Sequence, residues 1–473
     1  MTGVSSDPSP VRPQVGRLDA LLMRLRAPVD GASLAAFRIA FGLVAVLEVY
    51  RYFAHDWISR YWVEPEFHFT YLGFGWVRPM PETAMHLLWM VLGFAAIGIT
   101  LGVFYRASCV VFALGFGYSF LLESARYLNH FYLIALLAAL LALVPADRVW
   151  SVDMSPANEP KKKKDRAIPV WSLRLIQFQI AVVYIYGGIA KLESDWLHGE
   201  PMTTWLSQES DLFLIGPLLA QEWVGLAAAW GGLFFDLFIV LAVAWKRTRI
   251  IALLAAAGFH LSNNELFHIG VFPYLAFAGL LLFCAPDWPR ALLRRLDIVQ
   301  PSPPEVREAP VPLTDVQRTR VAPIALALAT IFVVVQLTVP LRHVLLPGKS
   351  NWTEAGHTFA WHMKLRIKEG KADFVVINPA TKKAVVVDPR IELTSWQYDK
   401  MAIRPEMLRQ YAHHLADRAA DDGIPDVKVH ARTAASLNNR PDQLLVDPKV
   451  DLAAEGPTLG TPSWVVPLER PLP

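Results

Sequence analysis

Nine apolar segments divide most of this sequence, and they restrict its fold more than any other feature. Each is roughly 17 to 25 residues long, the length at which a helix crosses the hydrocarbon core of a bilayer. Their approximate bounds are 33–53, 84–103, 107–123, 128–146, 170–190, 222–245, 249–265, 267–284 and 321–340. Backbone polar groups need internal hydrogen bonds in lipid, so such segments form helices. The sequence therefore predicts an α-helical polytopic membrane domain with about nine spans.

The composition supports a lipid environment for these segments. Of the 473 residues, 54% are hydrophobic and 18% are charged, whereas soluble domains are about 25% charged. The net charge is only +3, and the Lys and Arg residues lie in the gaps between the apolar segments. A nucleic-acid binder needs a concentrated basic face, so we expect no nucleic-acid partner.

The charges in the gaps between the segments predict the orientation, because cytoplasmic loops carry an excess of Lys and Arg. One set of gaps is basic and contains Arg106; Arg148, Lys161, Lys162, Lys163, Lys164 and Arg166; Lys246, Arg247 and Arg249; and Arg290, Arg294, Arg295, Arg307, Arg318 and Arg320. The opposite gaps contain only Arg60, Arg78, Arg126 and Lys191. We therefore expect a cytoplasmic N-terminus and an exoplasmic C-terminus, in the cell membrane of a prokaryote or the endoplasmic reticulum of a eukaryote.

The polar segments predict the domain limits. Residues 1–30 lack the compact apolar stretch of a cleavable signal peptide and are expected to be a cytoplasmic segment. Residues 31–345 would form the membrane domain, with a proline-rich cytoplasmic linker from Pro301 to Pro312 before the last span. Cys109 and Cys284 both fall inside predicted spans, so no disulfide framework is expected.

Residues 346–473 have a different pattern and are expected to form a soluble exoplasmic domain. Short β-rich runs occur at 374–378, 384–388 and 427–431, and helical spacing of apolar residues occurs at 405–420. This pattern predicts a small domain of α+β or β-sandwich-like fold.

With this orientation, three hairpins bring polar side chains to the exoplasmic face of the membrane. Asn129 and His130 begin the fourth segment, and Lys191 ends the fifth. The turn between the seventh and eighth segments adds His260, Asn263, Asn264, Glu265 and His268. We expect Asn129, His260, Asn263, Asn264 and His268 to be candidates for binding a polar organic substrate.

Lys191 has two readings that the sequence leaves about equal. A lysine at a helix end often extends to the lipid headgroups and has no further role. However, Gly187, Gly188 and Ala190 allow close helix packing, which would surround the ammonium group with protein. A desolvated lysine is more easily deprotonated, and a neutral amine is a general base.

The histidines also have alternatives. His130 taken alone is more often an interfacial histidine bonded to a neighbouring hairpin than a catalytic group. His260 and His268 could share a metal ion, but a turn separates them and Glu265 is the only acidic residue nearby. Hydrogen bonding to a polar organic ligand is favoured, and no metal is predicted.

Several spaced motifs resemble the vitamin K-dependent γ-glutamyl carboxylases, members of the horizontally transferred transmembrane (HTTM) domain family. They are Tyr127–Leu133, Gly188–Trp196, Phe259–Gly270, Phe283–Arg290, Ser350–Glu354, Phe359–Met363, Met407–Ala412, Leu445–Asp451 and Ser463–Pro467. The resemblance covers about residues 30 to 467.

The resemblance implies a lyase reaction coupled to quinone epoxidation. In this family, vitamin K hydroquinone (reduced phylloquinone or menaquinone) is deprotonated and reacts with O2, and the resulting alkoxide removes the γ-proton of a protein-bound Glu. CO2 then adds, which gives γ-carboxyglutamate and vitamin K epoxide. Lys191 matches the family's catalytic base, and His130 matches a histidine that steadies the oxygen intermediates. Trp361, His362 and Arg404 match the substrate channel. The resemblance thus implies that the substrate or the quinone is bound by these three residues and by Asn129, His260, Asn263, Asn264 and His268.

The implied partners are a Glu-containing protein or peptide, the lipid quinone and membrane lipids. One alternative is a quinone epoxidase or oxygenase without carboxylation. Another is a non-enzymatic transporter or receptor on the same scaffold. A transporter lines its path with polar residues at mid-membrane depth, whereas the polar residues here gather at one face, which favours the enzyme.

Overall fold

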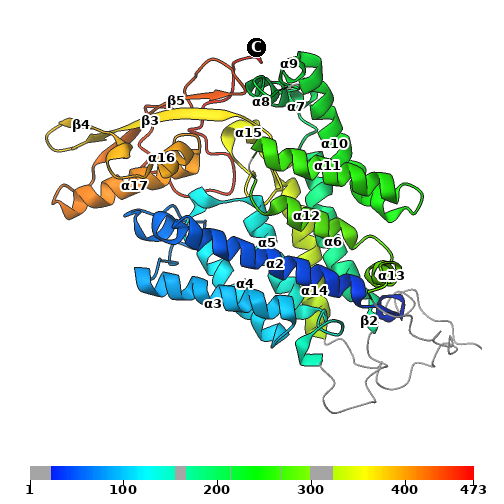
Figure 1. Cartoon of the computed structure of the whole chain (residues 1–473). Coiled ribbons are helices and arrows are strands. Elements are labelled where there is room, and N and C mark those ends of the chain that lie inside the picture. Colours follow the sequence, from blue (N-terminus) through cyan, green and yellow to red (C-terminus); the bar gives the residue numbers. More distant parts are fainter. Residues whose placement is uncertain (1–22, 155–166, 214, 268, 299–322, 473) are drawn as a thin grey trace, which may run out of the picture.

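The computed structural model describes residues 23–154, 167–213, 215–267, 269–298 and 323–472. Most of these residues are helical, and a small sheet lies in the C-terminal part, at one end of the helix bundle (Figure 1). The predicted linker from Pro301 to Pro312, most of the predicted N-terminal segment and His268 lie outside the described residues.

Each of the nine predicted segments contains a helix. They are α2 (Ala32–Ala54), α3 (Glu82–Leu101), α4 (Tyr105–Leu121), α5 (Asn129–Leu143), α6 (Val170–Ile189), α10 (Glu222–Ala244), α11 (Arg249–Phe267), α12 (Phe272–Leu281) and α14 (Pro323–Thr338). Within the described chain, six helical segments are long and apolar enough to cross a membrane: α2, α3, α6, α10, α11 and Ala327–Leu345, which joins α14 to the 3-10 helix η6 (Val339–Leu345). Helices α4, α5 and α12 are apolar but shorter. The polytopic membrane class is confirmed.

Helix α12 is shorter than the apolar run that predicted it, 267–284. Gly270 has a φ of 66°, in the left-handed region, and this turn separates α11 from α12. Pro273 lies in the first turn of α12, where its missing N–H costs no helical hydrogen bond. The beginning of the run is therefore used for a turn.

The helices differ in how much protein surrounds them. In α2 and α6, 67% of the residues in the most apolar stretch are buried by other parts of the protein. The same fraction is 17% in α11 and 11% in Ala327–Leu345. Most of the exposed side chains of these last two helices are apolar, as a lipid-facing surface requires. Helices α2 and α6 therefore form the centre of the bundle.

Small residues bring α6 close to α10, as the sequence predicts. A Cβ atom at Gly188 would lie 2.7 Å from the Leu237 side chain. A Cβ at Gly187 would lie 3.3 Å from Asp236 Oδ2. Larger residues at Gly188 would force the helices apart, and the two glycines permit the contact from which the site described below is built.

Shorter elements complete the bundle. They are β1 (Pro28–Asp30) and β2 (Ala167–Pro169), which pair antiparallel, the π-helix η1 (Ser59–Val63), η2 (Ser124–Arg126), η3 (Val152–Met154), α7 (Ser194–Leu197), α8 (Met202–Gln208), α9 (Gly216–Leu219) and α13 (Trp288–Arg295). Cys109 is buried and Cys284 is half-buried, and both are free thiols.

The C-terminal domain has a three-stranded antiparallel sheet in the order β4-β3-β5. The strands are β3 (Lys368–Ile377), β4 (Ala384–Val387) and β5 (Lys428–Leu437), and the helical elements are α15 (Ser350–Thr353), η7 (Pro389–Ile391), α16 (Ser395–Met401) and α17 (Pro405–Asp421). Each of the four predicted runs overlaps one of these elements, to within one residue at its ends. Strand β3 begins six residues earlier than predicted, because its polar first half pairs with β5 from Lys368 opposite Leu437.

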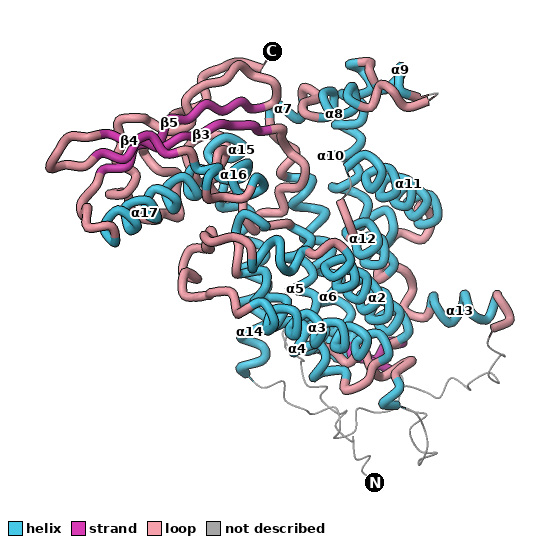
Figure 2. The backbone as a smooth tube through the Cα atoms, turned by 60° about the vertical axis from the view of Figure 1, so that its left-hand side comes forward, coloured by secondary structure: helices cyan, strands magenta, loops and turns pink. Residues whose placement is uncertain are grey.

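The α+β expectation is confirmed and the β-sandwich alternative is wrong for the described part of this domain. Helices α16 and α17 lie on the side of the sheet that faces the membrane helices (Figures 1 and 2). Leu408 and Tyr411 of α17 are fully buried in one cluster with Phe374 of β3. A helix therefore covers the apolar face that a second sheet would cover in a sandwich.

Buried polar contacts hold this domain on the helix bundle. The Arg440 guanidinium donates to both Asp195 carboxylate oxygens over 2.7 and 2.9 Å, and Asn438 Nδ2 donates to the same carboxylate over 2.9 Å. At another point, Gln397 Nε2 donates to Glu123 Oε2 over 3.0 Å. These groups are almost fully buried, and a buried charge is stable only when it is paired in this way.

Candidate active site

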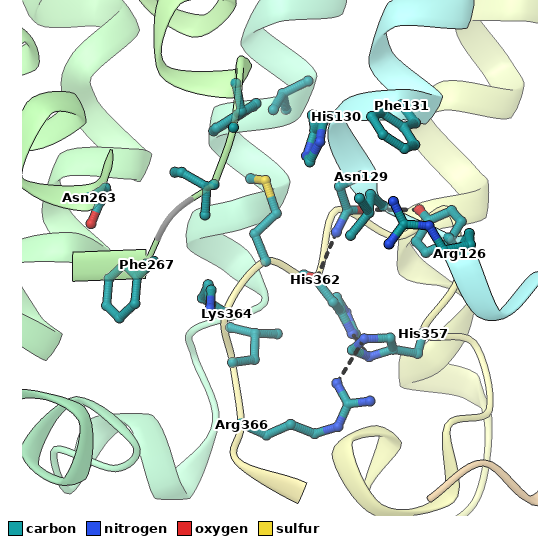
Figure 3. Close-up of a pocket in the computed structure, with 18 of the residues that line it drawn as sticks. Arg126, Asn129, His130, Phe131, Asn263, Phe267, His357, His362, Lys364 and Arg366 are labelled. Carbon is teal, nitrogen blue, oxygen red and sulfur yellow. Dashed lines mark hydrogen bonds between the residues drawn. The ribbon is translucent and has the colours of Figure 1, made fainter. Parts of the chain in front are cut away.

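A cavity of about 640 Å³ lies where the helix bundle meets the C-terminal domain (Figure 3). The bundle contributes Asn129, His130, Lys191, Asp236, Phe259, His260, Asn263, Phe267 and Phe272 to its walls, and the C-terminal domain contributes His357, His362, Lys364, Arg366, Lys368, Lys400 and Arg404. The volume is in the range of small-molecule sites. Residues from three hairpins of the bundle and from the C-terminal domain thus face one space.

Lys191 lies just beyond the end of α6 and is 5% exposed. Its Nζ donates to Asp236 Oδ2 of α10 over 2.6 Å and to the Gly187 carbonyl over 3.0 Å. The Trp196 ring lies 5.1 Å from Nζ. The lysine therefore does not extend to the headgroups. The protein surrounds it, which is the second of the two readings that the sequence left open.

Asp236 was not singled out from the sequence, although a signal was present. It is the only charged residue in the apolar stretch 223–244 of α10. A carboxylate inside a membrane helix is costly unless it has a partner, and such residues mark functional sites. Lys191 is that partner.

The residues after Lys191 hold the turn in place. Glu193 accepts from the backbone N–H groups of Asp195 and Trp196 and so caps α7. Burial raises the pKa of Asp195, but the hydrogen bonds from Arg440 and Asn438 outweigh it and lower the pKa to about 2. The motif therefore anchors the C-terminal domain beside the catalytic candidate.

Asn129 and His130, at the start of α5, also reach the cavity. His130 contacts the rings of Phe131 and Phe272, with centroids 4.6 and 6.3 Å away. The Asn129 amide donates to the His362 carbonyl over 2.8 Å and so joins α5 to the C-terminal domain (Figure 3). The alternative for His130 was a structural role, with a hydrogen bond to a neighbouring hairpin. No such bond is present among the described residues.

Residues of α11 form the opposite wall. His260 is buried, and its Nε2 lies 2.8 Å from the Tyr184 hydroxyl. Asn263 lines the cavity, while Asn264 is half-buried and does not. Adjacent residues on a helix point about 100° apart, and Asn264 points away from the cavity that Asn263 lines.

Trp361 does not line the cavity, contrary to the sequence expectation. Its side chain is fully buried and stacks on Tyr132, with ring centroids 5.0 Å apart. It belongs to the core of the bundle. His362 and Arg404, the other two residues matched to the substrate channel, do line the cavity.

Five cationic side chains of the C-terminal domain line the cavity, and we call them the basic wall: Lys364, Arg366, Lys368, Lys400 and Arg404. Burial lowers the pKa of Lys368 and of Lys400 to about 8. Glu354 pairs with Arg366 and Lys368, over 2.6 and 3.3 Å. Cations outnumber anions along the whole lining, so the cavity favours an anionic ligand.

Of the basic wall, the sequence motifs predicted only Arg404, although a signal for the rest existed. Lys364, Arg366 and Lys368 alternate along the chain, and alternate residues of an extended segment point to one side.

Among the described residues, no group of three or more His, Cys, Asp or Glu side chains is placed to hold a metal ion.

The sequence profile of the HTTM domain matches residues 26–288. That is more than half of the chain, and the protein therefore belongs to the HTTM class of polytopic membrane proteins. Residues 321–471 match the lumenal domain of vitamin K-dependent gamma-carboxylase. With both domains in order, the chain is a member of the vitamin K-dependent gamma-glutamyl carboxylase family. No solved structure matches it significantly.

Proposed function

We propose that this protein is a vitamin K-dependent γ-carboxylase that couples epoxidation of vitamin K hydroquinone by O2 to the carboxylation of protein-bound Glu by CO2. The observation that carries the proposal is the composition of the cavity. A buried Lys191–Asp236 pair lies on its membrane side and the basic wall lies on its soluble side. A lipid substrate and an anionic peptide side chain could thus meet in one space.

The Lys191–Asp236 pair supplies the base. Lys191 passes its proton to Asp236 and takes one from the hydroxyl of the bound hydroquinone. The pair gains one net proton, and this positive charge offsets the negative charge left in the cavity. A 2.6 Å hydrogen bond between the two side chains provides the path for the first transfer.

The hydroquinone, O2 and CO2 are substrates, and the membrane side of the cavity suits the first of them. The rings of Phe259, Phe267 and Phe272 give the cavity an apolar lining, and the Phe272 ring centroid lies 6.3 Å from that of His130. Apolar walls with a few placed polar groups are typical of sites for flat organic ligands. They also keep water away from the reactive oxygen species. His130 is proposed to steady these species.

The basic wall is proposed to hold the Glu carboxylate of a protein or peptide. Arginine binds carboxylates through paired hydrogen bonds, and Arg404 donates from Nη1 to the Ser124 carbonyl over 3.3 Å. Burial lowers the pKa of Arg404 somewhat from its ordinary value, which reflects how little water surrounds it. A carboxylate would compensate this desolvation.

We further propose the membrane topology. The nine helices are taken as nine spans, with residues 1–30 in the cytoplasm, 31–345 as the catalytic membrane domain and 346–473 on the exoplasmic side. The arrangement of the basic gaps supports this orientation. It brings the cavity to the exoplasmic face.

The test is a paired assay on purified protein in mild detergent. Epoxide formation and fixation of labelled CO2 into a Glu peptide are measured for wild type and Lys191→Arg. Wild type should show both activities, and the arginine variant neither, because a guanidinium does not deprotonate in a protein. Near-wild-type turnover by Lys191→Arg would reject Lys191 as the base. Epoxidation without CO2 fixation by wild type would identify a quinone epoxidase.

A further inference from the structure

A chain of four side chains from the C-terminal domain ends at the cavity, and we call it the histidine chain: Glu354, Arg366, His357 and His362. Arg366 Nη2 lies 2.6 Å from both carboxylate oxygens of Glu354. Arg366 Nη1 lies 2.9 Å from His357 Nε2. His357 Nδ1 lies 3.0 Å from His362 Nδ1 (Figure 3).

The order of donors and acceptors in the histidine chain follows from Arg366. A guanidinium is always a donor, so His357 Nε2 must accept. A neutral imidazole carries one proton, which in His357 is therefore on Nδ1. His357 then donates to His362 Nδ1, and the single proton of His362 must be on Nε2.

Both histidines are neutral in this arrangement. Burial, and then the positive charge of Arg366, hold the pKa of His357 well below its ordinary value. Burial and the neighbouring His343 do the same for the pKa of His362. The titratable or charged groups that act on His362 are His343 and Arg342 from η6, His357, Arg366 and, from the end of α6, Lys191.

His362 ends the chain with an unused donor. Its side chain lines the cavity and the residue is only 6% exposed. Nε2 has no hydrogen-bond partner among the described residues. A buried N–H group without a partner is costly and in native proteins usually indicates a missing ligand.

The histidine chain cannot conduct protons, because Arg366, which lies between Glu354 and His357, neither accepts a proton nor gives one up. What it can do is select one tautomer of His362. We propose that His362 is a neutral hydrogen-bond donor, oriented by His357, Arg366 and Glu354, for an anionic oxygen of the ligand in the cavity. This rests on the proposed function, in which that oxygen belongs either to the ionised hydroquinone or to the Glu carboxylate.

The decisive variants change the polarity of one bond and little else. In His357→Asn the amide N–H can still donate to His362 Nδ1. In His357→Asp the carboxylate can only accept, so His362 must protonate Nδ1, and Nε2 loses its proton at neutral and high pH. At low pH the carboxylate stabilises the imidazolium, which donates from Nε2 again.

The expected rates follow. His362→Leu and, at pH 8, His357→Asp should lose roughly 10- to 100-fold in kcat/KM, the range for a hydrogen bond to a charged group. His357→Asn should recover most of the loss, and His357→Asp should regain activity toward pH 6. If the KM for the hydroquinone rises, the oxygen belongs to the quinone. If the KM for the Glu peptide rises, the oxygen belongs to the carboxylate. Equal impairment of His357→Asn and His357→Asp at every pH would overturn the proposal.

A second readout does not depend on turnover and so separates this proposal from the proposed function. In ¹⁵N-histidine-labelled protein, the imidazole signals of His362 are assigned by their loss in His362→Gln. Wild type and His357→Asn should show the Nε2–H tautomer, and His357→Asp should show the Nδ1–H tautomer. An Nδ1–H tautomer in wild type would refute the assignment even if the protein were an active carboxylase.

Discussion

The Lys191–Asp236 pair gives the sharpest test of how the site is held together. Both side chains are 7% exposed, and Lys191 Nζ lies 2.6 Å from Asp236 Oδ2. Asp236→Leu leaves the buried ammonium without its counter-charge, with only the Gly187 carbonyl to accept from it, and Lys191→Met leaves the buried carboxylate without its counter-charge. Each single substitution should cost roughly 3–5 kcal/mol of unfolding free energy, whereas the double substitution should cost far less, because replacing both charges with apolar groups is often nearly neutral.

The assay is a double-mutant cycle. The unfolding of wild type, both single variants and the double variant is measured in the same detergent by circular dichroism against added denaturing detergent. The coupling energy is the excess of the two single losses over the loss in the double variant. We expect it to reach several kcal/mol and to have the sign of an attractive pair.

A matched control comes from the surface of the C-terminal domain. Arg432 and Asp373 are 3.5 Å apart across β3 and β5 but are 54% and 43% exposed. Asp373→Asn should cost at most about 1 kcal/mol, because exposed ion pairs contribute little. Coupling between Lys191 and Asp236 as small as this control would refute the reasoning that the pair is desolvated and mutually dependent.

Four further predictions follow from the site and the topology. Lys191→Ala should lose roughly 10²–10⁴-fold in epoxidation, and a small added amine should restore part of it; no recovery with any amine in a folded variant would count against the amine's role. Because the pKa of Asp195 is lowered to about 2, from about 3.9 in an unfolded chain, the stability it contributes should be present above about pH 4 and lost as the pH falls toward 2. Asp195→Asn should remove that part of the acid sensitivity, and unchanged acid unfolding would contradict the assignment. Deletion after Val344 removes the basic wall and should abolish Glu-dependent CO2 fixation, although the helices still insert; fixation at the full rate would show that the domain is dispensable. A reporter active only outside the cytoplasm, fused after Pro473, should be active, and a stable but inactive fusion would disprove the orientation.

The sequence was sufficient for the fold class because span length and helix packing are local properties. An apolar run of about 20 residues must be helical in lipid, whatever its neighbours are. The Gly187 and Gly188 pair likewise indicated a close helix contact, which is present, and made a buried Lys191 one of the two readings that the sequence left open. Residues at the same end of several spans converge, so Asn129 and His130 share a cavity with His260 and Asn263.

Tertiary structure decided which of these groups are paired and which face away. Asp236 is 45 residues from Lys191 along the chain, and only the packing of α6 against α10 makes it the partner. Trp361 and Asn264 satisfied the same sequence criteria as their neighbours, yet one packs in the core and the other turns from the cavity. Which atoms donate and which accept in the histidine chain depends on Arg366 Nη1 lying 2.9 Å from His357 Nε2. The amino-acid sequence alone does not give such distances.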